Sequence, residues 1–356
     1  MSAGPGSEVA RARSLPVAVQ HEVNAKAYCA LPLCVVLGHG ASWWYRHRFI
    51  QLCAYELESE PRPRVLDYCD AFAYAGFLAA YRIDRAAAEQ LDLLGFLAEC
   101  VDAGRYPVVM VDNTRLTGAG PPLREFLVYG LDDEGVRAVG FGPDTRFGSL
   151  TFPAERFRDA FTSGLARMSG ESRRALFNHS ANDSAITHVV QVLSAPKADE
   201  AADLARIRGQ IRAYLTSARP AGFDVCGGWW WYPRSTDISA DAPVRFGIAT
   251  YDLLLEHLRA NEGRLAGRGY SLYHVYFEHK KIMLDRLRRC SPAGAADPLV
   301  RAYDGVAASA DRFRLRVLLS QKQGKPLPSA MIERLEVLRA TEREILTAWL
   351  EQREPA

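Results

Sequence analysis

The chain has 356 residues, of which 48% are hydrophobic, 24% charged and 10% aromatic. This is the composition of a globular protein, and it excludes a disordered chain, a collagen-like chain and a small disulfide scaffold. Lys and Arg together number 44 against 42 Asp and Glu. The resulting net charge of +2 gives no reason to expect nucleic acid or an anionic membrane as a partner.

The cysteines argue against a thiolate zinc site or a stapled secreted fold, because their number is odd and no two form a CxxC pair. They are Cys29, Cys34, Cys53, Cys69, Cys100, Cys226 and Cys290. The first 20 residues contain no apolar stretch of the signal-peptide type, and no run approaches the about 18 apolar residues of a membrane span. We therefore expect a reduced, cytoplasmic protein.

The first half of the chain predicts an α+β unit. Residues 1–20 are small and polar and indicate a flexible arm, whereas the apolar stretch at 24–38 fits a buried helix or a buried strand equally well. A helix is expected at 85–103, followed by strands at 107–111, 125–131 and 136–141 and by a strand end and helix at 151–164. The sequence DDEG between the last two strands indicates a hairpin turn, so the sheet should be antiparallel and packed on helices.

The second half is richer in helical patterns. One helix is expected within 199–218, and further helices are expected at 247–259, 271–289, 304–319 and 331–351. We expect an α+β domain over 21–165, a connecting segment with one helix and a Trp-rich loop over 166–246, and a helical bundle over 247–356.

Two places in the sequence could carry chemistry. Cys29 lies near the start of the possible helix, where the helix N-terminus can lower a thiol pKa and produce a usable thiolate. Asp112 ends one strand, while Arg124 and Glu125 open the next, so these side chains could face a cleft. Each has a structural alternative, namely a small buried apolar residue for Cys29 and solvated strand ends for the others.

The order of several stretches resembles the papain-like family typified by butirosin biosynthesis protein H. The stretches are YPVVMVDN, FLVYGLDDEG, FGPDTRFG with TFPAERFRDAF, FGIATYDLLLEHL, YHVYFEHKKIMLDRL and the C-terminal EREIL. This family includes acyltransferases acting on carrier-protein thioesters, and tetramate-forming Dieckmann cyclases of actinobacteria are similar to it. The resemblance implies a papain-like fold, a nucleophile at Cys29 in NAKAYCALPL and an acidic site residue at Asp112.

The sequence departs from the family where relatives carry a histidine, since Leu123, Arg124 and Glu125 occupy those positions. An arginine stays protonated and cannot act as a general base. One account keeps an acylated Cys29, with Glu125, Asp112 or a distant histidine as the base. The other forms no covalent intermediate: Asp112 or Glu125, its pKa raised by burial, removes a proton and Arg124 stabilises the enolate or oxyanion.

Aromatic and histidine side chains are candidates for binding the substrate. Trp43 and Trp44 lie between His39 and His47, and either histidine could be a displaced base. Trp230 belongs to a run of aromatic residues that could line an acyl channel, and His279 could line the cleft. Core packing is the alternative interpretation of each.

The resemblance implies an enzyme of natural-product biosynthesis that acts on a polyketide or peptide intermediate. Its partner would be an acyl or peptidyl carrier protein with the substrate on a phosphopantetheine arm, and the reaction would be cyclising release or acyl transfer. No motif implies a metal or an organic cofactor. The alternative is a catalytically divergent relative that binds such an intermediate, as a binding protein or as a promoter of non-covalent cyclisation.

Overall fold

The structure is a computed structural model of the chain, and its residues fall into two compact units. It describes residues 13–56, 64–69, 74, 78–83, 85–120, 122–167, 187–192, 203–221, 223, 243–260 and 269–352. The first unit, here called the sheet unit, comprises Met1–His21, Leu31–His39 and Tyr74–Ala195. The second, the bundle unit, comprises Glu22–Ala30, Gly40–Ala73 and Pro196–Ala356. The division falls inside helix α1 (Ala27–Gly38), so the units are interleaved along the sequence.

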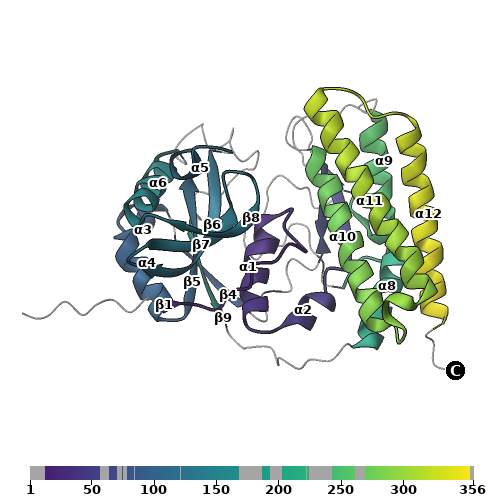
Figure 1. Cartoon of the computed structure of the whole chain (residues 1–356), viewed down its shortest axis with the longest axis horizontal. Coiled ribbons are helices and arrows are strands. Elements are labelled where there is room, and N and C mark those ends of the chain that lie inside the picture. Colours follow the sequence, from purple (N-terminus) through teal and green to yellow (C-terminus); the bar gives the residue numbers. More distant parts are fainter. Residues whose placement is uncertain are drawn as a thin grey trace, which may run out of the picture. The chain divides into compact units, whose positions relative to one another are not determined.

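The sheet unit is built on a seven-stranded antiparallel sheet (Figure 1). Its strands are β1 (Arg13–Ser14), β4 (Leu78–Ile83), β5 (Arg105–Asp112), β6 (Leu123–Asp132), β7 (Gly135–Phe141), β8 (Phe147–Phe152) and β9 (Thr187–Val192). The order is β4-β9-β5-β6-β7-β8, with β1 pairing on β6. Helices α3 (Arg85–Glu89), α4 (Leu93–Asp102), α5 (Asn113–Thr117) and α6 (Ala154–Arg167) complete the unit.

The β6–β7 hairpin shows how local chemistry sets the register of this sheet. Asp132 pairs with Gly135, and its Oδ1 accepts hydrogen bonds from the backbone N–H of Glu134 at 3.0 Å and of Gly135 at 3.2 Å. Gly135 has a φ of 132° and leaves no room for a Cβ, which would lie 2.0 Å from the carbonyl oxygen of Phe152. Only glycine fits at this position without strain.

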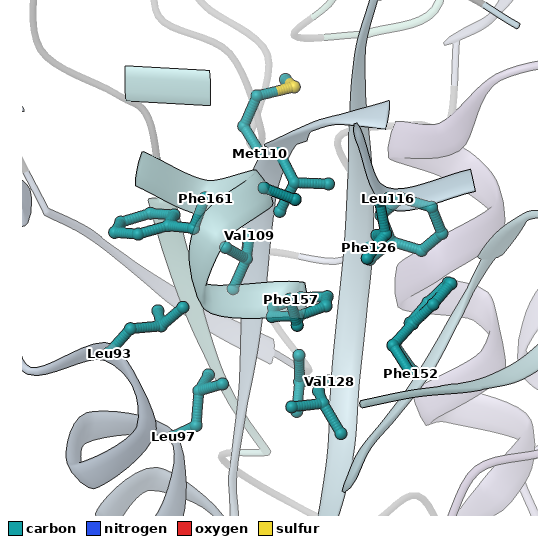
Figure 2. Packing of buried hydrophobic residues seen from close by; sticks show 14 of the residues in the cluster. Leu93, Leu97, Val109, Met110, Leu116, Phe126, Val128, Phe152, Phe157 and Phe161 are labelled. Atoms are coloured by element: carbon teal, nitrogen blue, oxygen red, sulfur yellow. The ribbon is translucent and has the colours of Figure 1, made fainter. Parts of the chain in front are cut away.

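Helix α6 closes the core of the sheet unit. Figure 2 shows Phe157 and Phe161 of this helix among Val109 and Val128 of the sheet and Leu93 of α4, and all of them are buried. Burying one phenylalanine side chain contributes about 1.5–3 kcal/mol. Since α6 is polar on its outer face, this apolar contact fixes which side of the helix meets the sheet.

The bundle unit combines a small sheet with long helices (Figure 1). The antiparallel order is β10 (Arg245–Phe246), β2 (Leu52–Glu56) and β3 (Arg64–Tyr68). The helices are α2 (Ser42–Arg46), α8 (Leu204–Leu215), α9 (Thr250–Ala260), α10 (Gly269–Cys290), α11 (Pro298–Gln323) and α12 (Ala330–Glu351), besides the first turn of α1. Helices α10, α11 and α12 follow one another through short connections and lie side by side, and α10 packs on β3.

The predicted α+β class with antiparallel sheets is confirmed. The undecided stretch at 24–38 forms helix α1, and the helix expected at 85–103 is divided into α3 and α4. The sequence did not predict strands β1, β2, β3, β4, β9 and β10. Strand β1 lies in the arm 1–20 that was expected to be flexible and pairs with β6, while β9 and β10 lie within the stretch 166–246 expected to be a connection. No helix of the described residues is long and apolar enough to cross a membrane.

Candidate functional site

Asp112 ends β5 and caps the N-terminus of α5. Its Oδ1 accepts from Thr114 Oγ1 at 2.5 Å and from the backbone N–H of Thr114 at 3.0 Å and of Arg115 at 3.3 Å. Its Oδ2 accepts from Ser163 Oγ at 2.7 Å and pairs with Arg167 Nε at 2.6 Å. Burial acts to raise the pKa of Asp112, but these hydrogen bonds and the charge of Arg167 outweigh it and lower the pKa. The expectation of a burial-raised pKa is therefore wrong for Asp112.

Arg124 and Glu125 lie on β6, opposite Val111 and Met110 of β5. The half-buried guanidinium of Arg124 lies 4.9 Å from the centre of the Phe141 ring, and its Nε is buried without a hydrogen-bond partner among the described residues. Burial lowers the pKa of Arg124, although a guanidinium remains protonated at neutral pH. Glu125 is partly exposed. The sheet unit thus places Asp112, Arg124 and Glu125 at neighbouring positions of two paired strands.

Cys29 lies in the first turn of α1 and belongs to the bundle unit. Its exposed fraction is 0%, and burial raises the pKa of its thiol well above the usual value. The negative charges of Asp67 and Glu278 raise the pKa further, while Lys26 acts in the opposite direction. The prediction of a lowered thiol pKa is therefore wrong, because burial and neighbouring carboxylates outweigh the helix N-terminus.

Asp67 on β3 is the carboxylate that the sequence reasoning missed. It is fully buried, accepts hydrogen bonds from the Tyr28 hydroxyl and, at 2.8 Å, from the backbone N–H of Tyr68, and it interacts electrostatically with Cys29. Burial raises the pKa of Asp67 to about 6, although Lys26 and both hydrogen bonds oppose the shift. An acidic residue inside the apolar run VLDYC was the available signal, since a buried strand rarely carries a charge.

Glu278 of α10 and Tyr68 of β3 complete a buried polar cluster. Glu278 Oε1 accepts from the backbone N–H of Asn24 at 2.5 Å and of Ala25 at 2.8 Å, whereas its Oε2 is buried without a partner among the described residues. The Tyr68 hydroxyl is likewise buried and unpartnered there. Burial, followed by the charges of Glu278, Cys29 and Asp67, raises the pKa of Tyr68. We call Tyr28, Cys29, Asp67, Tyr68 and Glu278 the α1 cluster.

A partly exposed stretch of chain leads into the α1 cluster in the sequence. Residues 24–28 are all partly exposed, and they include Tyr28, whose hydroxyl reaches Asp67. Because burial raises the pKa of Tyr28 well above 10.0, the phenol stays protonated and can donate to the carboxylate. The arrangement provides a buried carboxylate with a pKa of about 6 that accepts a hydrogen bond from a phenol.

His279 lies in the interior of the bundle unit rather than in the α1 cluster. Its Nε2 lies 2.9 Å from the carbonyl oxygen of Ile50, its Nδ1 lies 3.2 Å from Lys280 Nζ, and its ring stacks on Tyr214. Burial, and then the charge of Lys280, lowers its pKa well below 6.5. Both ring nitrogens thus have partners inside the protein, and these contacts support a structural role for His279.

The predicted aromatic candidates also have packing partners. Trp43 is half-buried and stacks on His47, while Trp44 is buried against Phe49 and under the guanidinium of Arg48. His47 Nε2 accepts from the backbone N–H of Asp203 at 2.9 Å. Trp230 lies outside the described residues.

The candidate histidine His39 belongs to the sheet unit. Its Nε2 lies 3.1 Å from the Tyr106 hydroxyl, which in turn donates to the carbonyl oxygen of Pro16 at 2.9 Å. Burial lowers the pKa of His39. Among the predicted residues, Cys29, Trp43, Trp44 and His279 belong to the bundle unit and Asp112, Arg124 and Glu125 to the sheet unit.

Comparison with protein-family models and with curated proteins finds no match to this chain. Within the described ranges, no group of histidine, cysteine and carboxylate side chains is arranged to hold a metal ion.

Proposed function

We propose that the chain is a cytoplasmic, papain-like enzyme that processes an acyl thioester delivered by a carrier protein, with cyclising release as the reaction. The order of the motifs shared with the butirosin biosynthesis protein H family supports the substrate class and the fold. The observation that carries the chemistry is Asp67, a buried carboxylate with a pKa of about 6 that is hydrogen-bonded to Tyr28. A base whose pKa lies close to neutral pH is well suited to proton transfer.

The α1 cluster favours the route without a covalent intermediate. Burial and the neighbouring carboxylates raise the pKa of Cys29 well above its usual value, so the thiolate that a covalent route needs is disfavoured at neutral pH. Cys29 is also completely buried, whereas Tyr28, whose hydroxyl donates to Asp67, is partly exposed as a residue.

In the proposed step, the Tyr28 hydroxyl takes a proton from the carbon between two carbonyl groups and passes its own proton to Asp67. The resulting carbanion attacks the thioester carbonyl, the new C–C bond forms and the C–S bond breaks. The carrier's thiolate leaves and receives a proton back from Asp67 through Tyr28. The base therefore returns to its starting state, and no oxidant or metal is needed for the balance.

The first test is intact-protein mass and product analysis with an N-(β-ketoacyl)aminoacyl thioester of N-acetylcysteamine, in which the carbon between the ketone and amide carbonyls can reach the thioester carbonyl and close a ring. We expect cyclised product and no acyl adduct with wild type and with Cys29→Ala, and a loss of about 10²-fold or more in turnover with Asp67→Asn. Cys34→Ala is the matched control, because Cys34 is an equally buried thiol of the same helix.

The outcomes separate the two chemical routes. A stoichiometric adduct that disappears in Cys29→Ala would restore the covalent account, with Asp67 as the base that replaces the missing histidine. Full turnover by Asp67→Asn would show that Asp67 is not the base in either route.

The burial of Cys29 and Asp112 also favours a second candidate function, that of a non-catalytic binding protein. Cys29 is inaccessible, and the oxygens of Asp112 are occupied by a helix cap and an ion pair, as in a relative that has lost catalysis. Such a protein would bind a polyketide or peptide intermediate with an affinity that Cys29→Ala and Asp67→Asn leave unchanged. Thioester turnover by neither wild type nor variants, together with such binding, would support this function.

A further inference from the structure

One exposed face of α11 combines apolar and basic side chains. Leu315 and Leu319 are 47% and 46% exposed, which is unusual for leucine in this structure. They are four residues apart and therefore lie one above the other on the helix surface. The opposite side of the helix, which includes Phe313 and Val317, is buried.

Basic residues surround these leucines, and the nearest acidic residue before them in the sequence, Asp311, is paired with Arg314. Arg312, Arg316, Lys322 and Lys325 are exposed, and residues 312–332 contain no Asp or Glu. Among the described residues, the side chains of Arg316, Lys322 and Lys325 form no ion pair. We call Arg312, Leu315, Arg316, Leu319 and Lys322 the α11 face.

Several other cations of the bundle unit have an acidic partner. Arg259 pairs with Glu336, Arg339 pairs with Asp252 at 2.6 Å, and Arg314 on the inner side of α11 pairs with Asp311 at 2.5 Å. In a chain whose net charge is only +2, four exposed cations in a segment without Asp or Glu form a local basic region. Exposed apolar side chains rimmed by charges mark interaction surfaces.

We infer that the α11 face docks an acidic helix of the carrier protein, an inference that rests on the proposed function for the identity of the partner. An apolar side chain of the partner would lie between Leu315 and Leu319, with carboxylates opposite Arg312, Arg316 and Lys322. Such charge complementarity speeds association and sets the orientation of docking.

A membrane is the weaker fit for this face. Binding to a bilayer surface grows with the apolar area that can be inserted, and the inward side of α11 is already occupied by the bundle core. Only the two half-exposed leucines remain available. A helix of a partner protein can contact the two leucines and the cations at the surface, so no insertion of α11 is required.

The test is calorimetric titration of the full chain with an acidic holo acyl carrier protein of a bacterial polyketide pathway. We expect Arg316→Glu/Lys322→Glu and Leu315→Ser each to weaken binding by about tenfold or more and to lower kcat/KM for the carrier-bound substrate. Turnover of the N-acetylcysteamine thioester, which needs no docking, should stay at the wild-type value. The charge control is Arg206→Glu/Arg301→Glu, which changes the net charge equally at exposed positions of α8 and of the other half of α11. The apolar control is Val337→Ser, since Val337 is 65% exposed on α12.

Three results would overturn the inference. The first is equal carrier affinity of wild type and the α11-face variants, and the second is an equal loss in the charge control. The third is binding of wild type to phosphatidylserine vesicles but not to the carrier. If no thioester is turned over while carrier binding still depends on the α11 face, the docking surface stands and the proposed function fails.

Discussion

The hydroxyl of Tyr28, in the first turn of α1, donates a hydrogen bond to the carboxylate of Asp67 on β3. This bond and the backbone N–H of Tyr68 act to lower the pKa of Asp67, while burial acts to raise it and prevails. A carboxyl group inside the apolar run VLDYC thus has a pKa of about 6. Because this pKa lies within an accessible pH range, titration of Asp67 should be visible both in turnover and in the free energy of unfolding.

Asp67 should make the folded state less stable as the pH rises. Its pKa of about 6 in the folded protein lies above the ordinary 3.8, so the folded state binds more protons than the unfolded state between these values. The free energy of unfolding therefore falls as the pH rises through this window, by about 3 kcal/mol in total. Between pH 4 and pH 7, Asp67→Asn should gain that much stability relative to wild type in urea unfolding.

Asp133→Asn is the control for this measurement, because Asp133 is exposed in the β6–β7 turn. The difference in free energy of unfolding between Asp133→Asn and wild type should not change over the same pH range. A difference for Asp67→Asn that is equally flat would show that Asp67 has no raised pKa in the folded protein.

Tyr28→Phe should move the pH dependence of turnover. Loss of the hydroxyl removes a hydrogen bond that lowers the pKa of Asp67, so the rise of kcat with pH, expected near 6 in wild type, should shift to higher pH. Because the proposed relay also runs through this hydroxyl, kcat at the plateau should fall by about 10²-fold. Tyr81→Phe, at a tyrosine that is 54% exposed, should change neither quantity. A wild-type profile in Tyr28→Phe would exclude the relay.

Local patterns in the sequence predicted much of the fold. The turn residues DDEG identified the β6–β7 hairpin, and helical spacing identified α6 and helices α9 to α12. Strand β9 was missed because its place between β4 and β5 depends on pairing with residues far away in the chain. Such long-range pairing leaves little local signal.

The candidate site was less predictable, because pKa values depend on tertiary surroundings. The sequence placed Cys29 at the start of a helix but could not show that Asp67 and Glu278 lie near it and that the thiol is buried. It placed Asp112 at a strand end but could not show that Ser163 and Arg167 of α6 bind its carboxylate. In both cases the predicted direction of the pKa shift is reversed by tertiary structure, namely by burial and nearby carboxylates at Cys29 and by hydrogen bonds and an ion pair at Asp112.

Asp112→Asn should affect stability rather than turnover. The amide can still accept hydrogen bonds at the α5 N-terminus, but its nitrogen cannot accept from Ser163 or pair with Arg167, a loss of about 1–3 kcal/mol. Because the pKa of Asp112 is lowered in the folded protein, its contribution is present above pH 3.8 and is lost as the pH falls through the lowered value. Urea unfolding at pH 7 and pH 3 should therefore show a large difference from wild type at pH 7 and a smaller one at pH 3.

Turnover of the N-acetylcysteamine thioester by folded Asp112→Asn should match wild type. A loss of kcat at full stability would instead give Asp112 a part in the chemistry, as the sequence first indicated. Arg167→Gln provides a second variant that removes the ion pair and leaves the carboxylate in place.

The buried ion pair between Lys280 and Glu342 should be essential for the stability of the bundle unit. Lys280 Nζ lies 2.7 Å from Glu342 Oε2, both side chains are 0% exposed, and the hydroxyls of Tyr251 and Tyr303 also donate to this carboxylate. Lys280→Met leaves a buried carboxylate without its cation, which costs about 3–5 kcal/mol. The lost free energy would be measured by urea unfolding at pH 7.

The neighbouring residue provides a matched control for Lys280→Met. Lys281 pairs with Glu22 at 2.9 Å at side chains that are 42% and 40% exposed, so Lys281→Met should cost less than about 1 kcal/mol. The double variant Lys280→Met/Glu342→Leu should be more stable than Lys280→Met alone, because it removes the unpaired charge as well as the pair. Equal costs for Lys280→Met and Lys281→Met would mean that the Lys280–Glu342 pair is hydrated in solution, since only water could replace the lost cation so cheaply.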